Sequence, residues 1–430
     1  MDQERRNFIK SVSTFAALVP FSSIASSTLA AAGKRNPHII IRTAWQAVNI
    51  GDIGHTLGLL EMLSKYLPAA NVTIWPFREL DLGAGQLIKK KFPLVAITEG
   101  QILAGKPGTA ALQAAFDTSD FLIHSSGSGF VAKTDVQAWW DLTKKPFGVY
   151  GVTLTNIDAS QLELINNASF FYTRETTSLD HLLALKPQCP TVEFAPDATF
   201  AMEVADEQQA SLYLQEAGLK AGEFICVIPR LRYTPYFLMR NLTPTADEKS
   251  KYAISQFYKE VDHEKLRDVI TRWVRETGLK VLVCPEVTYQ VELGKEILVD
   301  LLPNDVKDKV IWRNTYWLPD LAQGVYAKSR ALVCFEPHSP IMAIHKGVPS
   351  MYVRQPTDTR KGQMFRDIGL GDWLFEIDFT AGIQIFNALK EIHEHYPKAL
   401  KKVEKAQQIV LKRQQATMAH IQKLADKITD

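Results

Sequence analysis

The amino-acid sequence predicts an α/β protein with two Rossmann-like domains facing a cleft, followed by a C-terminal helix. Short apolar runs alternate with segments of helical character, and this alternation occurs as two similar series. Strands that alternate with helices form parallel sheets covered on both faces, so each series predicts one sheet. The first series has apolar runs at 38–45, 72–75, 94–98, 121–124, 147–154, 170–172 and 192–194. The second series has apolar runs at 224–228, 280–284, 310–312, 331–335, 350–353 and 374–377.

The pattern also divides the chain into segments. An export signal with a linker, an N-terminal domain, a C-terminal domain and a closing helix are expected at residues 1–36, 37–205, 206–395 and 396–430, respectively. Residues 230–258 are interpreted as a long insertion without clear periodicity, of a length that often covers a site. In the closing helix, Ile409, Ala416 and Ile421 are expected to mark one buried stripe on a charged, solvated surface.

The amino terminus resembles a twin-arginine export signal. Arg5 and Arg6 precede Phe8 by a short spacing, and a modestly apolar run from Phe15 to Ile24 leads into small residues. The run is too short and too rich in serine to span a bilayer, so we expect a removed leader and no stable membrane span. The expected location is the periplasm or the cell surface. An unprocessed cytoplasmic leader is the alternative.

Composition and charge narrow the possible partners. The chain of 430 residues is 46% hydrophobic and carries 49 basic and 47 acidic residues, a formal charge of +2. Such a balance gives no overall field that would attract nucleic acid, so any positive site must be local. The four cysteines, Cys189, Cys226, Cys284 and Cys334, are interpreted as core residues with no metal-binding spacing.

The end of the first strand carries a candidate binding loop. Gly51 and Gly54 would let the backbone approach a ligand at the start of a helix, where an anion is favoured. Asn49 and Asp52 add polar groups at the same strand edge. A plain helix-capping role for Asp52 is the alternative.

Two further loops follow strands of the first series. Ser126, Gly127 and Ser128 lie in a small-residue loop that could aim backbone amides at a carboxylate or phosphate, or could be a tight turn. Arg174 stands at another strand end, where it could bind a ligand or pair structurally with Asp197.

The segment 333–349 is the strongest candidate site of the second series. Glu336 and His338 lie in a turn between an apolar run and a compact helix, at the carboxyl end of an expected parallel strand. Ligands of open α/β sheets bind at such edges. A metal site formed by His338 and His345 is not expected, because His338 is placed before the helix and no carboxylate repeats the spacing.

Taken together, five motifs resemble the polysaccharide pyruvyl transferase family and cover about residues 39–377 in the order typical of that family. The motifs are Asn49-Ile50-Gly51-Asp52, the loop 125–129, the segment 174–178, Pro196-Asp197-Ala198, and His338 with 343–349. The resemblance implies a GT-B arrangement without a cofactor, and an enzyme that places the three-carbon unit of phosphoenolpyruvate as a ketal across two hydroxyls of a sugar.

This resemblance also implies roles for individual residues. His338 would be the acid for the methylene carbon, and Arg230 would bind the anionic donor. Glu336 stands where the family motif has an arginine; an acid there repels the donor unless Arg354, Arg313 or Lys361 neutralises it. The catalytic candidates are His338, Glu336 and Asp52. The candidates for substrate binding are Arg230, Asn49, Gly51, Ser126, Gly127, Ser128, Arg174 and Lys361.

Two other classes of function stay open at this point. The same fold could perform glycosyl transfer, or remove an acyl or ketal group from an extracellular glycan. A non-catalytic glycan-binding protein is the third class, with Trp139, Trp140 and Trp317 as sugar platforms. The acceptor sugar and the oligomeric state are not determined by the sequence.

Overall fold

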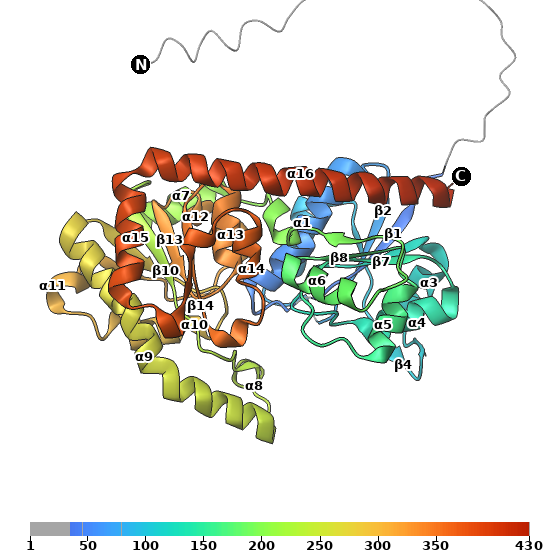
Figure 1. Cartoon of the computed structure of the whole chain (residues 1–430), viewed down its shortest axis with the longest axis horizontal. Coiled ribbons are helices and arrows are strands. Elements are labelled where there is room, and N and C mark those ends of the chain that lie inside the picture. The colour runs from blue at the N-terminus through green and yellow to red at the C-terminus, as the bar shows by residue number, and fades with distance from the viewer. Residues whose placement is uncertain (1–34, 45, 79, 430) are drawn as a thin grey trace, which may run out of the picture. The chain divides into compact units, whose positions relative to one another are not determined.

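The computed structural model describes residues 35–44, 46–78 and 80–429, so the expected export signal lies outside the described residues. Residues Asn36–Asp430 form one compact unit. Two parallel sheets make up this unit, which confirms the α/β prediction of two Rossmann-like halves (Figure 1).

The first half contains a seven-stranded sheet in the order β3-β2-β1-β6-β7-β8-β9. Its strands are β1 (His38–Arg42), β2 (Asn71–Trp75), β3 (Ala96–Ile97), β6 (Phe121–His124), β7 (Phe147–Val152), β8 (Phe170–Thr173) and β9 (Val192–Phe194). Its helices are α1 (Ile50–Tyr66), α2 (Ala84–Lys91), α3 (Ala110–Thr118), α4 (Lys133–Thr143), α5 (Ala159–Asn166) and α6 (Thr176–Ala184). A small hairpin, β4 (Ile102–Leu103) and β5 (Lys106–Pro107), and the 3-10 turn η1 (Ala198–Ala201) complete it.

The second half contains a six-stranded sheet in the order β12-β11-β10-β13-β14-β15. Its strands are β10 (Phe224–Ile228), β11 (Lys280–Val283), β12 (Val310–Trp312), β13 (Ala331–Cys334), β14 (Ser350–Arg354) and β15 (Leu374–Glu376). Its helices are α7 (Glu207–Glu216), α8 (Tyr236–Met239), α9 (Ala246–Thr277), α10 (Gln290–Leu293), α11 (Asn304–Lys307), α12 (Pro319–Tyr326), α13 (His338–His345), α14 (Gln363–Asp367) and α15 (Gly382–Glu394). Short turns of other helix types are η2 (Gly294–Val299), η3 (Pro356–Asp358), η4 (Gly371–Trp373) and η5 (Ile377–Phe379).

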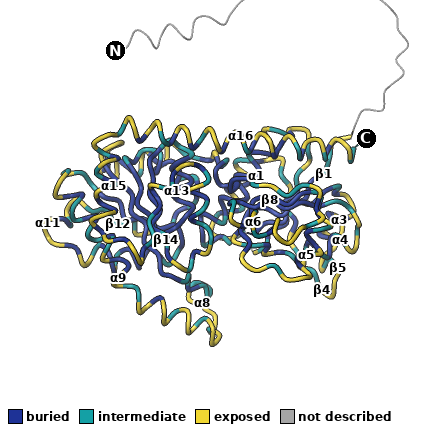
Figure 2. Tube along the Cα trace, viewed as in Figure 1, coloured by how far each residue is buried: buried dark blue, intermediate teal, exposed yellow. Residues whose placement is uncertain are grey.

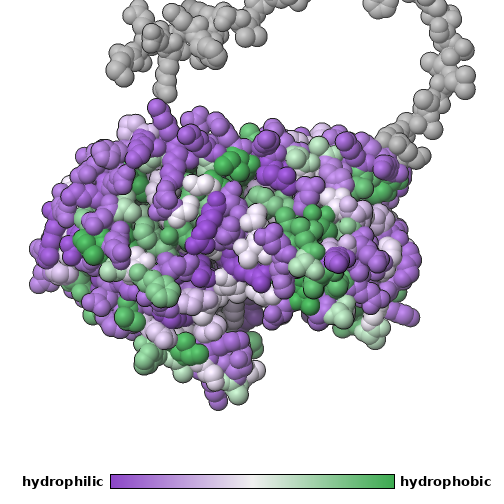
Figure 3. Space-filling view, in the orientation of Figure 1, coloured by the Kyte–Doolittle hydropathy of each residue, from purple (hydrophilic) through white to green (hydrophobic). Residues whose placement is uncertain are grey.

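Burial follows the strands, as expected for sheets covered on both faces. Figure 2 shows the buried residues gathered along both sheets, and every residue of β6, β7, β10 and β13 is buried. The four cysteines are free and buried, which confirms that they are core residues. On the face shown in Figure 3, hydrophilic side chains predominate. None of the helices in the described part of the chain is long and apolar enough to cross a membrane.

The closing helix α16 (Tyr396–Thr429) runs along both halves and packs against α1, α13 and α15 (Figure 1). The expected buried stripe was wrong at two positions, because Ile409 is 39% exposed and Ala416 is exposed. The buried stripe is offset and recurs every three to four residues, as a packed helix requires. Its members are Ala399, Val403, Ala406, Val410, Gln414, Thr417, Met418, Ile421 and Ala425.

The interpretation of residues 230–258 as a long insertion without periodicity was wrong from Ala246 onward, although Thr234 and Tyr236 of its first part line the cavity described below. Residues from Ala246 onward are the first turns of α9, a single helix that continues to Thr277. Thr245 and Glu248 form a capping box that starts this helix, because each side chain accepts a hydrogen bond from the backbone N–H of the other. Much of this part of α9 is exposed, so it lacks the periodic apolar face by which helices are recognised in sequence.

The proposed tryptophan platforms are wrong for two of three residues. Trp139 is fully buried, and Trp317 is 3% exposed with its indole N–H donating to the Pro285 carbonyl. Trp140 is half-buried, with its ring packed edge-on against Phe147. Burial of the flat faces leaves Trp139 and Trp317 unable to stack on a sugar.

Candidate functional site

Most of the predicted site residues meet at one cavity of about 210 Å³. Asn49 and Arg174 reach it from loops after strands of the first half, and Arg230 and Glu336 from loops after strands of the second half. The carboxyl edges of both sheets therefore contribute to the same cavity, as expected for open α/β folds. The lining residues are Ala44, Gln46, Asn49, Asp52, His55, Phe77, Ser128, Val131, Arg174, Arg230, Thr234, Tyr236, Glu336, His338 and Lys361.

Three predicted binding residues do not line this cavity. The Oγ of Ser126 is buried and donates to the Tyr150 carbonyl, and the Gly127 N–H donates to the Gly151 carbonyl. These groups join β6 to β7, so the expectation that this loop aims amides at an anion is wrong at Gly127. A side chain at Gly51 would meet the His338 ring at 2.3 Å. Gly51 makes room for a catalytic candidate rather than for a ligand.

The start of α1 is fixed by Asn49 and not by Asp52. The Asn49 side chain accepts hydrogen bonds from the Gly51 and Asp52 N–H groups, as a helix N-cap does. The Asp52 carboxylate is thereby free to face the cavity, where it accepts a hydrogen bond from Gln46 at 3.3 Å. Burial raises the pKa of Asp52, against the opposing effects of His55 and His338. The capping alternative for Asp52 was therefore wrong.

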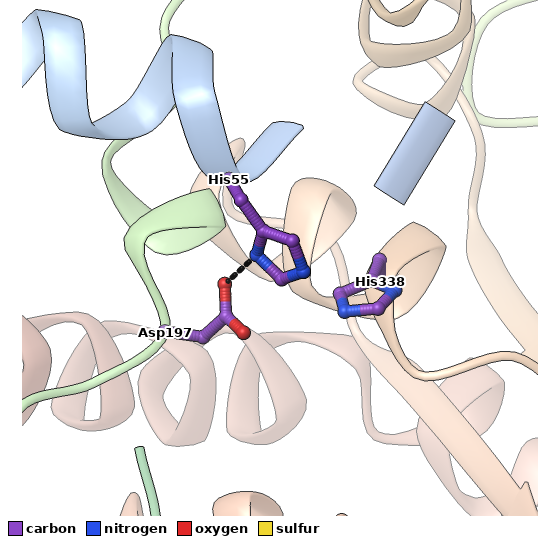
Figure 4. Close-up of side chains that lie close together, drawn as sticks. All are labelled: His55, Asp197 and His338. Atoms are coloured by element: carbon purple, nitrogen blue, oxygen red, sulfur yellow. Dashed lines mark hydrogen bonds and ion pairs between the residues drawn. The ribbon is translucent and has the colours of Figure 1, made fainter. Parts of the chain in front are cut away.

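Behind the cavity, the first half contains a buried histidine, carboxylate and arginine. His55 Nδ1 lies 2.9 Å from Asp197 Oδ1 (Figure 4), and Arg174 Nη1 lies 2.8 Å from Asp197 Oδ2. This confirms the structural pairing of Arg174 with Asp197. Burial lowers the pKa of His55 although Asp197 opposes the change. Burial alone would raise the pKa of Asp197, but His55 and Arg174 hold it well below its ordinary value.

In the second half, His338 is held by a carboxylate that the sequence analysis did not single out. His338 is the first residue of α13 and not, as expected, a residue before it. Its Nδ1 lies 3.1 Å from Glu286 Oε1, and the other oxygen of Glu286 accepts hydrogen bonds from the Ser339 N–H and hydroxyl. Glu286 thus fixes both the ring and the start of its helix, while His338 Nε2 is buried without a hydrogen-bond partner among the described residues.

Arg230 already has internal partners. It forms an ion pair with Asp358, and its Nε lies 3.1 Å from Glu336 Oε1. Burial alone would lower the pKa of Arg230, but Asp358 and Glu336 raise it well above the ordinary value. Lys361 Nζ lies 4.0 Å from Asp358, and burial lowers the pKa of Lys361 against the effect of that carboxylate. Arg230 is therefore a compensated cation and not a free anion anchor.

Glu336 was expected to repel an anionic donor, but its environment favours the uncharged carboxyl group. Burial raises its pKa to about 8, against the effect of Arg230, so the carboxyl group is mostly protonated at neutral pH. The Gln290 side chain donates a hydrogen bond to it at 2.7 Å. Of the residues named to neutralise it, Arg354 pairs with Glu376, while Arg313 stacks on the rings of Tyr213 and Trp317.

A metal ion does not suit this arrangement. His55, Asp197 and His338 each offer an atom within 4.8 Å of the others. The Asp197 carboxylate, however, is already occupied by the Arg174 guanidinium, a buried positive charge that disfavours a cation beside it. His345 is separate from the cluster, because its ring pairs with Glu203 where it is partly exposed.

Sequence reasoning missed two residues that define the site. Glu286 follows β11 by three positions, so its place after a parallel strand was a signal that could have found it. His55 lies one turn after Asp52 on α1, where its position beside the candidate loop was a signal, but an imidazole inside an amphipathic helix resembles a core residue. Its partner Asp197 is distant in sequence.

The fold and the site together define a two-lobed GT-B protein whose cavity lies between Rossmann-like halves. Similar solved structures include a UDP-GlcNAc 2-epimerase from Neisseria meningitidis bound to UDP-GlcNAc, with 11% identity and a TM-score of 0.54 over 88% of this chain and 99% of that one. Another is Alr3699/HepE from Anabaena in complex with UDP-glucose, with 12% identity and a TM-score of 0.55 over 90% and 99% of the two chains. At these identities the similarity concerns the fold.

The family is shown by sequence. The model of the polysaccharide pyruvyl transferase family matches residues 49–355, and the chain belongs to that family. This confirms the resemblance inferred from the five motifs. A comparison with curated proteins gave no match.

Proposed function

We propose that the protein transfers a pyruvyl group from phosphoenolpyruvate to two hydroxyls of a sugar in a polysaccharide. The observation that carries this proposal is a pair of buried, unpaired side-chain nitrogens beside one cavity. Arg174 Nη2 and His338 Nε2 are both buried without a hydrogen-bond partner among the described residues. A buried polar atom left unpaired costs about 1–3 kcal/mol, so a pair of them in a cavity favours an acceptor-rich ligand.

The charge and size of the cavity support a small anionic donor. Arg174 and Lys361 bring N–H groups to the cavity beside the compensated Arg230, and the protonated Glu336 can donate a hydrogen bond instead of repelling a carboxylate. A volume of about 210 Å³ lies below the 300–1,000 Å³ typical of sites for larger ligands. It suits a three-carbon acid better than the nucleotide sugars bound by the structural neighbours.

We place the acceptor glycan in an adjoining groove. This groove of about 570 Å³ shares Arg230, Thr234 and Tyr236 with the cavity wall. Its other lining residues include Tyr233 and Tyr252, so aromatic faces lie beside hydrogen-bonding groups, a combination that suits sugar rings. The cavity that this groove adjoins is lined by His338, which would protonate the methylene carbon as the sugar oxygen attacks.

The test uses labelled phosphoenolpyruvate and candidate glycans with the purified protein, read by mass spectrometry. We expect a pyruvyl ketal on the glycan, and loss of product in His338→Gln. His345→Gln is the matched control, because His345 lies at the other end of α13 and pairs with Glu203. Absence of product from every acceptor, or full activity of His338→Gln, would overturn the proposal.

A second candidate is removal of the same ketal from an exported glycan. The expected twin-arginine leader favours it, since phosphoenolpyruvate is a cytoplasmic metabolite and an exported enzyme would not meet it. Incubation with a pyruvylated glycan and no donor separates the two reactions: release of free pyruvate supports removal, and an unchanged glycan supports transfer.

A further inference from the structure

Two imidazoles that line the cavity, one from each half of the molecule, are in edge-to-face contact. His55 comes from α1 and His338 from α13; their ring centroids lie 4.8 Å apart with the planes perpendicular. In Figure 4 the ring of His55 lies between Asp197 and His338, with its second nitrogen turned toward the His338 ring. Both rings form their hydrogen bonds through Nδ1, to Asp197 and to Glu286. This leaves Nε2 of each ring available for proton transfer.

The carboxylates behind the two rings are not equivalent. Asp197 is neutralised by Arg174, and it also accepts a hydrogen bond from the Thr199 N–H at 2.9 Å. The ion pair found for Glu286 in the described part of the chain is with His338, and its other hydrogen bonds come from Ser339. Asp197 therefore orients the His55 ring while sharing its charge with an arginine, whereas Glu286 shares its charge with no cation other than His338 among the described residues.

We propose that His55 is a second catalytic residue, whose Nε2 takes the proton of the attacking sugar hydroxyl while His338 protonates the donor. The proposal rests on the proposed transfer of a pyruvyl group. Burial lowers the pKa of His55 and keeps its ring neutral, as a base must be. Asp197 holds the proton of this neutral ring on Nδ1, so the lone pair is on Nε2.

The two rings then complete the reaction in two balanced steps. In the first, the hydroxyl proton moves to His55 Nε2, the sugar oxygen bonds to C2 of the donor, and the C2–C3 double bond takes a proton from His338 Nε2. In the second, the other hydroxyl bonds to C2 and gives its proton to the now neutral His338. The C2–O bond to phosphate breaks, and phosphate leaves with the proton from His55. Both rings return to their starting states.

The experiment compares wild-type protein with His55→Asn, in which the asparagine amide N–H can still donate to Asp197 but no Nε2 base exists. We expect kcat to fall by about 10²–10⁴-fold, with the KM for phosphoenolpyruvate changed less than about threefold. In the wild type, the rate should fall at low pH as His55 takes a proton, and the variant should lose this dependence. The charged groups facing His55 are Asp197 and Arg174 behind it, Asp52 on its own helix and His338 opposite.

His345→Asn is the matched control and should retain wild-type kinetics, since His345 pairs with Glu203 away from the cavity. A rate of His55→Asn within tenfold of the wild type, with the low-pH dependence preserved, would overturn the proposal while leaving pyruvyl transfer intact. Absence of turnover in the wild type would instead refute the proposed function.

The protonation state of His55 can also be measured in the wild-type protein without substrate, so this test depends neither on turnover nor on a folded variant. In ¹⁵N-histidine-labelled wild type, NMR should show His55 neutral with its proton on Nδ1 between pH 6 and 8. A ring that is charged at pH 7, or that carries its proton on Nε2, would also overturn the assignment of His55 as a base.

Discussion

Each half of the molecule brings a buried arginine and a buried histidine to the cavity, but the halves balance these cations differently. In the first half, Arg174 and His55 share one carboxylate, Asp197. The corresponding groups of the second half, Arg230 and His338, are surrounded by Glu286, Glu336 and Asp358.

This difference assigns the two halves different tasks. The first half has a spare donor on Arg174 and a neutral base, so it can bind an anion and accept a proton. The second half places more carboxyl groups around its arginine and histidine, and burial, with lesser effects of Glu286 and Asp358, raises the pKa of Glu336 to about 8. In the proposed transfer, the donor would therefore bind against Arg174 and receive its proton from the second half.

The largest expected effect comes from replacing each of the two buried arginines in turn. Arg174→Gln leaves the buried Asp197 without its cation, because His55 and the Thr199 N–H then supply only hydrogen bonds, so the free energy of unfolding should fall by about 3–5 kcal/mol in chemical denaturation. Arg230→Gln should cost less, because Asp358 keeps the Tyr352 hydroxyl, the Gln355 N–H and the nearby Lys361.

Adding Asp197→Asn to Arg174→Gln should recover part of the loss, since the uncompensated charge is removed. An equal fall in the free energy of unfolding for Arg174→Gln and Arg230→Gln would mean that both halves compensate their arginine to the same extent.

A second prediction concerns Gly51, where α1 of the first half packs beside the His338 ring of the second half. In Gly51→Ala the new methyl group would meet the His338 ring at 2.3 Å and displace it. We expect kcat to fall by at least about 10²-fold, the lower end of the range for losing an acid catalyst. Gly129→Ala is the control, because its nearest neighbour would lie at 3.9 Å. Wild-type turnover in Gly51→Ala would show that His338 can act from another position.

A third prediction concerns the raised pKa of Glu336 in the second half. The pKa of Glu336 is raised to about 8 in the folded protein from an ordinary value of 4.5, so the folded state binds more protons between these values. Stability from this group is therefore complete below about pH 4.5 and is lost as pH rises to 8, with a slope of at most about 1.4 kcal/mol per pH unit. Denaturation of Glu336→Gln across this range should lack that component. If stability depends on pH equally in both proteins, the pKa of Glu336 is not raised by folding.

The smallest expected effect tests how the closing helix holds the first half. Thr417 on α16 lies 3.1 Å from the Tyr150 hydroxyl, and both residues are buried. Thr417→Val keeps the shape and removes this hydrogen bond, so the free energy of unfolding should fall by about 1 kcal/mol. Ala416→Ser, one residue away and exposed, is the control and should change stability less. Equal changes in unfolding free energy for the two variants would mean that the hydrogen bond between Thr417 and Tyr150 does not stabilise the fold.

The sequence located the elements well because strand signals are local. Runs such as 224–228 and 331–335 predicted β10 and β13 within one residue, since a strand buried on both faces is apolar throughout. The first part of α9 was missed because its residues are mostly exposed and carry no apolar period. The stripe on α16 was misplaced for a related reason: several apolar residues are close together there, and only packing chooses which of them faces inward.

By itself, the sequence determined the two-sheet fold, the family, and the strand ends that carry Asn49, Arg174, Arg230 and His338. Tertiary structure decided what these groups do, because His338 meets Glu286 from 52 positions away and Arg230 meets Asp358 from 128 positions away. Apolar patterning is imposed on each segment by its own burial and can be read locally. The protonation and availability of a buried charge depend on partners that only the folded chain brings within a few ångströms.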